Sequence, residues 1–158
     1  MTIPLFQGLF DKNIRDIPAS AERQRYLSTI VGPAENQGRW VEQPRLPHPV
    51  GEMGVVECQG KIHVFGGYSN HRVDGDYHQV FDPAKGEWTL KAPFPHRCNH
   101  NSAAAIGGKI YSFGGFVEQN RCPHSKCFVY DTATDSWSSI APLSRPRGAI
   151  FAIELNGK

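Results

Sequence analysis

The residues best suited to chemistry in this sequence are histidines and cysteines that gather in two short segments. The segments HRCNH and CPHSKC together hold three residues of each kind: His96, Cys98, His100, Cys122, His124 and Cys127. Imidazole and thiolate groups are the ligands that zinc and copper select. Neither segment has the C-x2-C spacing of common zinc sites, because four residues separate Cys122 from Cys127.

The same residues have simpler interpretations. Cys98 is expected to pack as a small apolar residue, and the histidines to be exposed hydrogen-bond donors. A disulfide between Cys122 and Cys127 is a further alternative, which a reducing compartment disfavours. We therefore predict no bound metal and no cofactor.

Sequence motifs of known catalytic sites are absent. The sequence has no nucleophile elbow, phosphate-binding loop, dinucleotide fingerprint or HExxH motif. His63 lies in an apolar run and is expected to be a half-buried strand residue. Nothing therefore identifies a catalytic residue, and a binding protein is favoured over an enzyme.

The composition narrows the class of protein. There are 16 glycines and 12 prolines among 158 residues, and 20% of the residues are charged. Such a chain is too apolar for a disordered protein, and short apolar runs broken by Gly and Pro are typical of all-β proteins. The net charge of +2 gives no reason to expect a nucleic-acid partner. With no apolar run long enough for a membrane helix and no signal-peptide pattern at the start, we expect no membrane association and a cytoplasmic location.

An internal repeat organises most of the chain. Tryptophans recur with a period of about 50 residues, at Trp40, Trp88 and Trp137. Two full copies, 40–88 and 89–137, are followed by the start of a third, 138–158. Because a four-stranded unit cannot bury both faces alone, it must stack on copies of itself.

Each copy is predicted to hold four strands, A to D. Strand A is predicted at 53–58, 101–106 and 149–155, and its continuous apolar runs predict burial on both faces. A two-residue turn with positive φ leads into strand B, at 61–65 and 109–113, which a glycine pair ends. Strand C is predicted at 77–81 and 126–130. Strand D carries Trp88 and Trp137, which we expect to be buried.

These landmarks resemble the kelch repeat, in which Gly-Gly follows strand B, a Tyr/Phe-Asp pair follows strand C and a tryptophan comes soon after. The resemblance covers residues 40–158 and implies an all-β fold, an incomplete kelch-type β-propeller of four-stranded antiparallel blades. Residues 1–39 form an N-terminal extension outside it. There, Ser20 and the following residues predict a short helix, with a strand over 26–31 as the alternative.

Kelch propellers usually close with more blades than this chain provides. Either the chain is a fragment or several chains assemble, and a fragment is favoured because the chain stops within a hairpin. Open apolar faces and unpaired strands also predict that the isolated chain self-associates.

The resemblance implies a binding role for one face. In kelch proteins, the loops from strand D to strand A and from B to C share a face that usually binds the partner. Here those loops are long and polar, and such loops commonly carry function. The candidate binding residues on them are His48, Glu52, Asn70, His71, Arg72, His96, Arg97, Asn99, His100, Arg121, His124, Arg145 and Arg147.

Two functions remain open. The first is a binding module that presents these loops to a protein or a glycan. The second is a fragment of a carbohydrate-active enzyme that is similar to galactose oxidase or to a bacterial sialic acid mutarotase. Glu52 and Arg147, near the starts of strand A, are expected to face a central pocket in that case.

Overall fold

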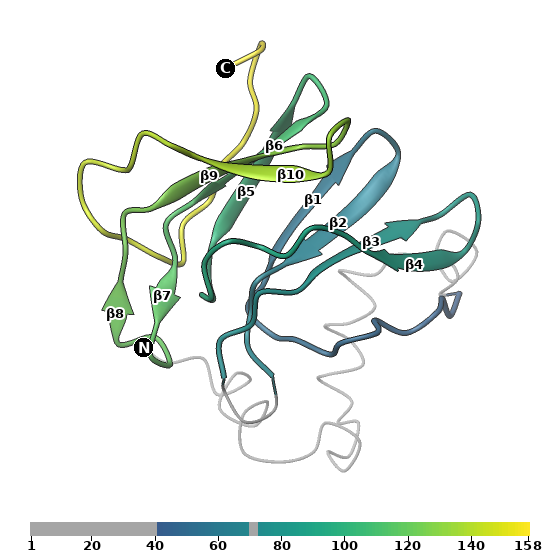
Figure 1. The fold of residues 1–158 in the computed structure, drawn as a ribbon, viewed down its shortest axis with the longest axis horizontal. Coiled ribbons are helices and arrows are strands. Elements are labelled where there is room, and N and C mark those ends of the chain that lie inside the picture. Colours follow the sequence, from purple (N-terminus) through teal and green to yellow (C-terminus); the bar gives the residue numbers. More distant parts are fainter. Residues whose placement is uncertain (1–40, 70–72) are drawn as a thin grey trace, which may run out of the picture. The chain divides into compact units, whose positions relative to one another are not determined.

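The computed structural model describes residues 41–69 and 73–158, which form only strands, turns and loops (Figure 1). The predicted helix or strand near Ser20, and Trp40 itself, lie outside the described residues. By its contacts the chain divides into two compact units, and the second, Gln43–Lys158, contains the strands β1 to β10. Among the described residues, none belongs to a helix that is long and apolar enough to cross a membrane.

Two four-stranded antiparallel sheets make up this unit. The first sheet has the order β1-β2-β3-β4, with strands Gly54–Cys58, Lys61–Phe65, His78–Asp82 and Glu87–Leu90. The second has the order β10-β9-β6-β5, with β5 Ser102–Ile106, β6 Lys109–Phe113, β9 Cys127–Asp131 and β10 Ser136–Ile140. The sheets are the two predicted blades. They do not close on themselves, as expected of an incomplete propeller.

Tight turns set the register of the β1–β2 and β5–β6 hairpins. Gln59 and Gly60 join β1 to β2 with φ angles of 54° and 75°, and Gly107 and Gly108 join β5 to β6 with 57° and 76°. Two consecutive residues with positive φ form the turn whose twist matches that of the paired strands. The predicted two-residue turns are therefore confirmed.

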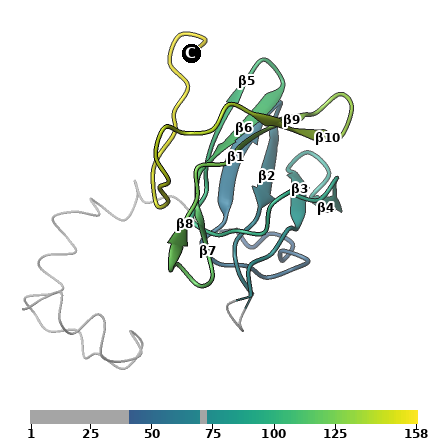
Figure 2. The same ribbon diagram turned by 60° about the vertical axis from the view of Figure 1, so that its left-hand side comes forward.

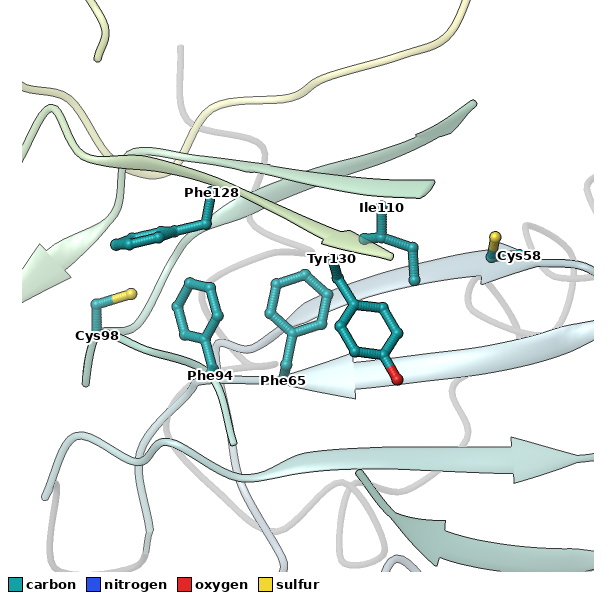
Figure 3. Packing of buried hydrophobic residues seen from close by; sticks show 7 residues of the cluster. All are labelled: Cys58, Phe65, Phe94, Cys98, Ile110, Phe128 and Tyr130. Carbon is teal, nitrogen blue, oxygen red and sulfur yellow. The ribbon is translucent and has the colours of Figure 1, made fainter. Parts of the chain in front are cut away.

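The hydrophobic core lies between the two sheets (Figure 3). Phe65 from β2 and Phe94 from the segment after β4 meet Phe128 and Tyr130 of β9, and Ile110 of β6 packs beside them. The ring centres of Phe94 and Phe128 lie 5.4 Å apart in an edge-to-face arrangement that aromatic pairs favour. Because one blade covers the other, each sheet buries a face that it could not bury alone.

Three sequence expectations are wrong in part. Strand β1 is not buried on both faces, because Val55 faces a pocket and is 50% exposed. Residues 149–155 form no strand, because they pair with no other strand among the described residues. Trp88 and Trp137 are half-buried rather than buried, and the Nε1 of each donates to a backbone carbonyl.

One hairpin outside the two blades was not expected from the sequence. Residues 116–125 were predicted to be loop, but β7 Phe116–Val117 pairs with β8 Cys122–Pro123. Glu118, Gln119 and Asn120 between them all have positive φ angles. The hairpin escapes sequence analysis because both strands have only two residues, too few to show a period.

Candidate functional site

Glycine pairs at the ends of β2 and β6 allow the loops to pack against one another. Gly66 and Gly67 have φ angles of 68° and 83°, and the N–H of Gly67 donates to the carbonyl of Cys98 over 2.8 Å. A Cβ on Gly67 would lie 2.6 Å from the carbonyl oxygen of Gly51. Only glycine therefore fits, which explains why a glycine pair follows strand B in both copies.

The segment between β4 and β5 lies between the two B–C loops. Its Asn99 exchanges backbone hydrogen bonds with Phe116 at the start of β7, with N–O distances of 2.9 and 2.8 Å. The Asn99 side chain donates through Nδ2 to Asp74 Oδ1 over 2.6 Å, and the N–H of Glu118 donates to Asp74 Oδ2. Asp74 therefore joins three loops through its two oxygens.

Glu52, His100 and Ala149 occupy the same position in the three copies of the repeat, just before strand A. All three have left-handed backbones, with φ angles of 54°, 52° and 51°. The N–H of His100 donates to the carbonyl of Glu52 over 2.6 Å, and the N–H of Ala149 donates to that of His100 over 3.0 Å. We call these three residues the rim. Left-handed residues other than glycine are strained, and such strain gathers at functional sites.

The rim brings together two of the predicted binding residues. His100 Nε2 lies 3.1 Å from Glu52 Oε2, and His100 Nδ1 lies 2.6 Å from Asn99 Oδ1. Asn99 presents its oxygen because its Nδ2 already donates to Asp74. Both ring nitrogens of His100 therefore face oxygen atoms, and these two contacts fix the orientation of the ring.

A pocket of about 460 Å³ opens beside the rim. Glu52, His100 and Ala149 line it together with apolar side chains that include Val55 and Phe151. Arg147, which was expected to face such a pocket, is not among the residues that line it. Its position in the repeat precedes that of the rim by two residues, and its backbone instead bonds to Gly115 and His124.

The suspected metal ligands separate into different environments. The rings of His96 and His124 are 4.6 Å apart, whereas His100 is paired with Glu52. Burial raises the pKa of Cys98 to about 12, so its thiol stays protonated at neutral pH. All four cysteines are free, and Cys122 is the exposed one. Within the residues that the structure describes, no group of three or more His, Cys, Asp or Glu side chains is arranged to hold a metal ion.

His96 and His124 form a neutral pair near a lysine. Burial, with smaller contributions from His96 and Lys126, lowers the pKa of His124 to about 4. Burial also lowers the pKa of His96, whose Nδ1 lies 3.4 Å from Lys126 Nζ. Both rings are therefore uncharged at neutral pH.

The other predicted binding residues are dispersed along the loops. Asn99 is fully buried and positions its neighbours. Arg97 pairs with Asp76 over 3.1 Å, and His48 stacks on Tyr77 with the ring centres 4.0 Å apart. Of the predicted binding residues, three exposed arginines form no ion pair within 41–69 and 73–158: Arg121, Arg145 and Arg147. Three further candidates, Asn70, His71 and Arg72, lie outside the described residues.

One buried polar pair was missed by sequence analysis. His63 was expected to be half-buried, but it is buried between the sheets, and its Nδ1 lies 2.9 Å from Nε2 of His78. No sequence signal marks this pair, because His78 lies in an ordinary strand C position. Its partner is recognised only once the register of β2 and β3 is known.

Comparison with known proteins supports the repeat assignment. A family model described as the kelch motif matches residues 97–144. Kelch-like protein 35 of Mus musculus is 40% identical over 48 residues, which are 30% of this chain and 8% of that protein. Kelch-like protein 35 of Homo sapiens gives the same identity and coverage. The chain thus matches a small part of these relatives, and the resemblance to kelch repeats is confirmed.

Proposed function

Because this chain is built of kelch repeats, we propose that it is a binding module that receives a segment of another protein at the rim and the loops around it. The kelch match and the similarity to kelch-like proteins favour protein interaction as the class of function. The D–A and B–C loops supply the polar groups for recognition, since each is fixed by hydrogen bonds to a neighbouring loop.

One observation supports this proposal above the others. Glu52 and His100 hold strained left-handed backbones at equivalent repeat positions, and their side chains meet beside a pocket of about 460 Å³. The pocket combines a contact between a carboxylate and an imidazole with apolar walls, as binding sites usually do. Because Asn99 and Asp74 hold the His100 ring, little side-chain entropy is lost when a ligand binds there.

The test is selection of random dodecapeptides displayed on phage against the full chain. We expect enriched peptides whose dissociation constants rise roughly tenfold in His100→Gly, as for a central interface residue. Glycine accepts the left-handed backbone, so this variant keeps the fold while losing the imidazole. Ala149→Gly is the matched control, because it makes the same backbone change at a rim position that offers no functional side chain.

Two outcomes would contradict the proposal. In one, no peptide is enriched over an unrelated immobilised protein. In the other, enriched peptides bind His100→Gly and the parent chain equally well. A chain that binds immobilised glycans through His100, and no peptide, would instead favour a carbohydrate ligand.

A further inference from the structure

The segment that follows the rim, residues 150–155, carries a regular apolar pattern. Its odd-numbered positions hold the most exposed large apolar side chains among the described residues: Phe151, Ile153 and Leu155. Ile150 and Ala152, which alternate with them, are half-buried and line the pocket beside the rim. Because side chains of an extended chain point alternately to its two sides, the three exposed residues share one face.

One backbone edge of this segment is free to pair. Leu155 exchanges two backbone hydrogen bonds with Lys158, over 2.9 and 3.2 Å, across a turn. Residues 150–154 form no backbone hydrogen bond among the described residues. Successive residues of an extended chain point their N–H and C=O groups to opposite edges, so those of Ala152 and Glu154 point away from the edge that Lys158 occupies. An edge of this kind is a template for another strand.

The pattern of side chains is self-complementary in an antiparallel pair of two molecules of this chain. When Ile153 of one molecule lies opposite Ile153 of the other, Phe151 lies opposite Leu155 at both ends of the pair. Glu154 then lies opposite Ala152, so no like charges meet. Each exposed apolar side chain thus contacts an apolar one of the second molecule, and such cross-strand pairs stabilise sheets.

Other registers of the same pair are less favourable. A two-fold axis through Glu154 would set two carboxylates directly opposite each other, which is destabilising. An axis through Ala152 would set Leu155 opposite Ala149, whose φ angle of 51° does not fit an extended strand. A shift by one residue would set Ile153 opposite Ala152 or Glu154 and place the apolar residues of the two molecules on opposite faces.

From this arrangement we infer that residues 150–155 pair with the same residues of a second molecule as an antiparallel, two-fold symmetric strand pair, with Ile153 at the axis. Backbone hydrogen bonds join Ala152 of each molecule to Glu154 of the other. Because both molecules use the same surface, the association closes at a dimer. This pairing goes beyond the proposed function and requires no partner protein at the rim.

Cysteine cross-linking of the full chain tests the register. Cys122→Ser first removes the exposed thiol, and Ile153→Cys in that background is oxidised with diamide and run on a non-reducing gel. On the free edge Ile153 forms a non-hydrogen-bonded pair, whose Cα atoms lie about 4.5 Å apart, within the range of a disulfide. We expect roughly tenfold more covalent dimer than for Leu90→Cys, because pairing raises the local concentration of the thiols. Leu90 is the matched control because it is an exposed apolar residue on β4.

Phe151→Cys and Leu155→Cys in the same background determine the direction of the strands. Neither should form a covalent dimer alone, because the two copies of either residue lie four positions apart along the pair, about 14 Å. An equal mixture of the two variants should form one, since the two positions lie opposite each other. All three positions are exposed, so cysteine there leaves the core unchanged.

Three results would overturn the inference. In the first, Ile153→Cys and Leu90→Cys form equal amounts of covalent dimer, as random collision would produce. In the second, Phe151→Cys and Leu155→Cys each link to themselves as readily as Ile153→Cys, which indicates parallel strands or no fixed register. In the third, the mixture of Phe151→Cys and Leu155→Cys gives no more dimer than either variant alone.

Discussion

His63 and His78 form a neutral pair, joined by a hydrogen bond, between the two sheets. His78 Nδ1 lies 3.3 Å from the carbonyl oxygen of Ala92, which can only accept, so Nδ1 carries the proton. Nε2 of His78 is then an acceptor for the N–H at Nδ1 of His63. This arrangement needs both rings to be neutral, and a proton added to His78 Nε2 would break it.

The first prediction is that acid destabilises the chain through this pair. Burial lowers the pKa of both histidines to about 4, and the charge of Lys61 adds to the effect at His63. In the unfolded chain each has a pKa near 6.5, so between these values the unfolded state binds more protons. The stabilising contribution of the neutral pair should therefore be complete above about pH 6.5. The free energy of unfolding should fall by at least about 1 kcal/mol as the pH drops towards 4.

Urea denaturation at a series of pH values measures this loss. His63→Gln/His78→Gln removes both titrating groups while keeping polar side chains, and its unfolding free energy should change less over the same range. His100→Gly serves as a control that leaves the buried pair intact. An unchanged pH dependence in the double glutamine variant would show that other groups cause the effect.

The second prediction concerns the exposed thiol of Cys122. The charge of Glu118 raises the pKa of Cys122, and its carboxylate accepts the S–H hydrogen bond. Glu118→Gln should therefore speed alkylation of Cys122 by iodoacetamide at pH 7.5 about threefold, because the thiolate is the reactive species. Peptide mass spectrometry measures the rate, with Glu87→Gln as the control. Faster alkylation of buried Cys98 than of Cys122 in the parent chain would contradict the structure.

At the scale of strands, each blade repeats one contact between strand D and the segment that precedes strand A of the same blade. Trp88 Nε1 donates to the carbonyl of Pro44 over 2.8 Å, and Trp137 Nε1 donates to that of Ala92 over 3.1 Å. In the second copy, additional hydrogen bonds hold this segment in place. The N–H of Ala92 and the hydroxyl of Tyr130 both donate to Asp135 Oδ1. Those two hydrogen bonds lower the pKa of Asp135, with that from Tyr130 the larger cause.

The third prediction is that the two tryptophans differ in their contribution to stability. Trp137 packs on Phe65, Phe94 and Tyr130, each with a ring-centre distance of 5.0 or 5.1 Å. Trp88 has one aromatic neighbour among the described residues, Phe81. Trp137→Ala should lower the free energy of unfolding by about 3 kcal/mol, and Trp88→Ala by clearly less. Urea denaturation of both variants measures the difference, and equal losses would contradict it.

The bounds of the strands show which parts of the fold could be predicted from the sequence. Strand B was predicted with its observed bounds, because a tight turn and a glycine pair mark its two ends. Strand C begins one residue later than predicted in both copies, at His78 and at Cys127. In each copy the residue before it lies opposite the glycine pair that ends strand B, where positive φ angles interrupt the regular pairing. Glu52 and His100 were both predicted as binding residues on the D–A loops. Their contact could not be predicted, since it depends on how the sheets pack and on three loops that meet at Asp74.

At the scale of the whole molecule, the segment after Ala149 differs from the rest. Phe151, Ile153 and Leu155 alternate along it and are 101%, 85% and 68% exposed. Within the described residues, its backbone bonds are those of Ala149 to His100 and of the turn between Leu155 and Lys158. Figure 2 shows the C-terminal end of the segment extending away from the two sheets. An extended chain with unpaired backbone groups and alternating apolar side chains is a template for strand pairing.

The fourth prediction is that this segment causes the chain to self-associate. A second copy can pair with its backbone and cover its apolar side chains, which removes both from water. Sedimentation velocity at tens of micromolar, on the order of the concentrations at which exposed strands aggregate, should show oligomers of the parent chain. Phe151→Ser/Ile153→Thr should shift the distribution towards monomer, because the apolar area offered to the second copy is reduced.

The control for this prediction changes exposed apolar residues elsewhere. Val73 and Leu90 are 58% and 56% exposed, and neither belongs to the segment after Ala149. Val73→Thr/Leu90→Thr should leave the proportion of oligomers unchanged, because exposed apolar side chains elsewhere on the surface are not their cause. A parent chain that sediments as a stable monomer at this concentration would mean that the segment folds back onto its own chain in solution. Equal loss of oligomers in both double variants would instead locate the association in dispersed apolar contacts, without strand pairing.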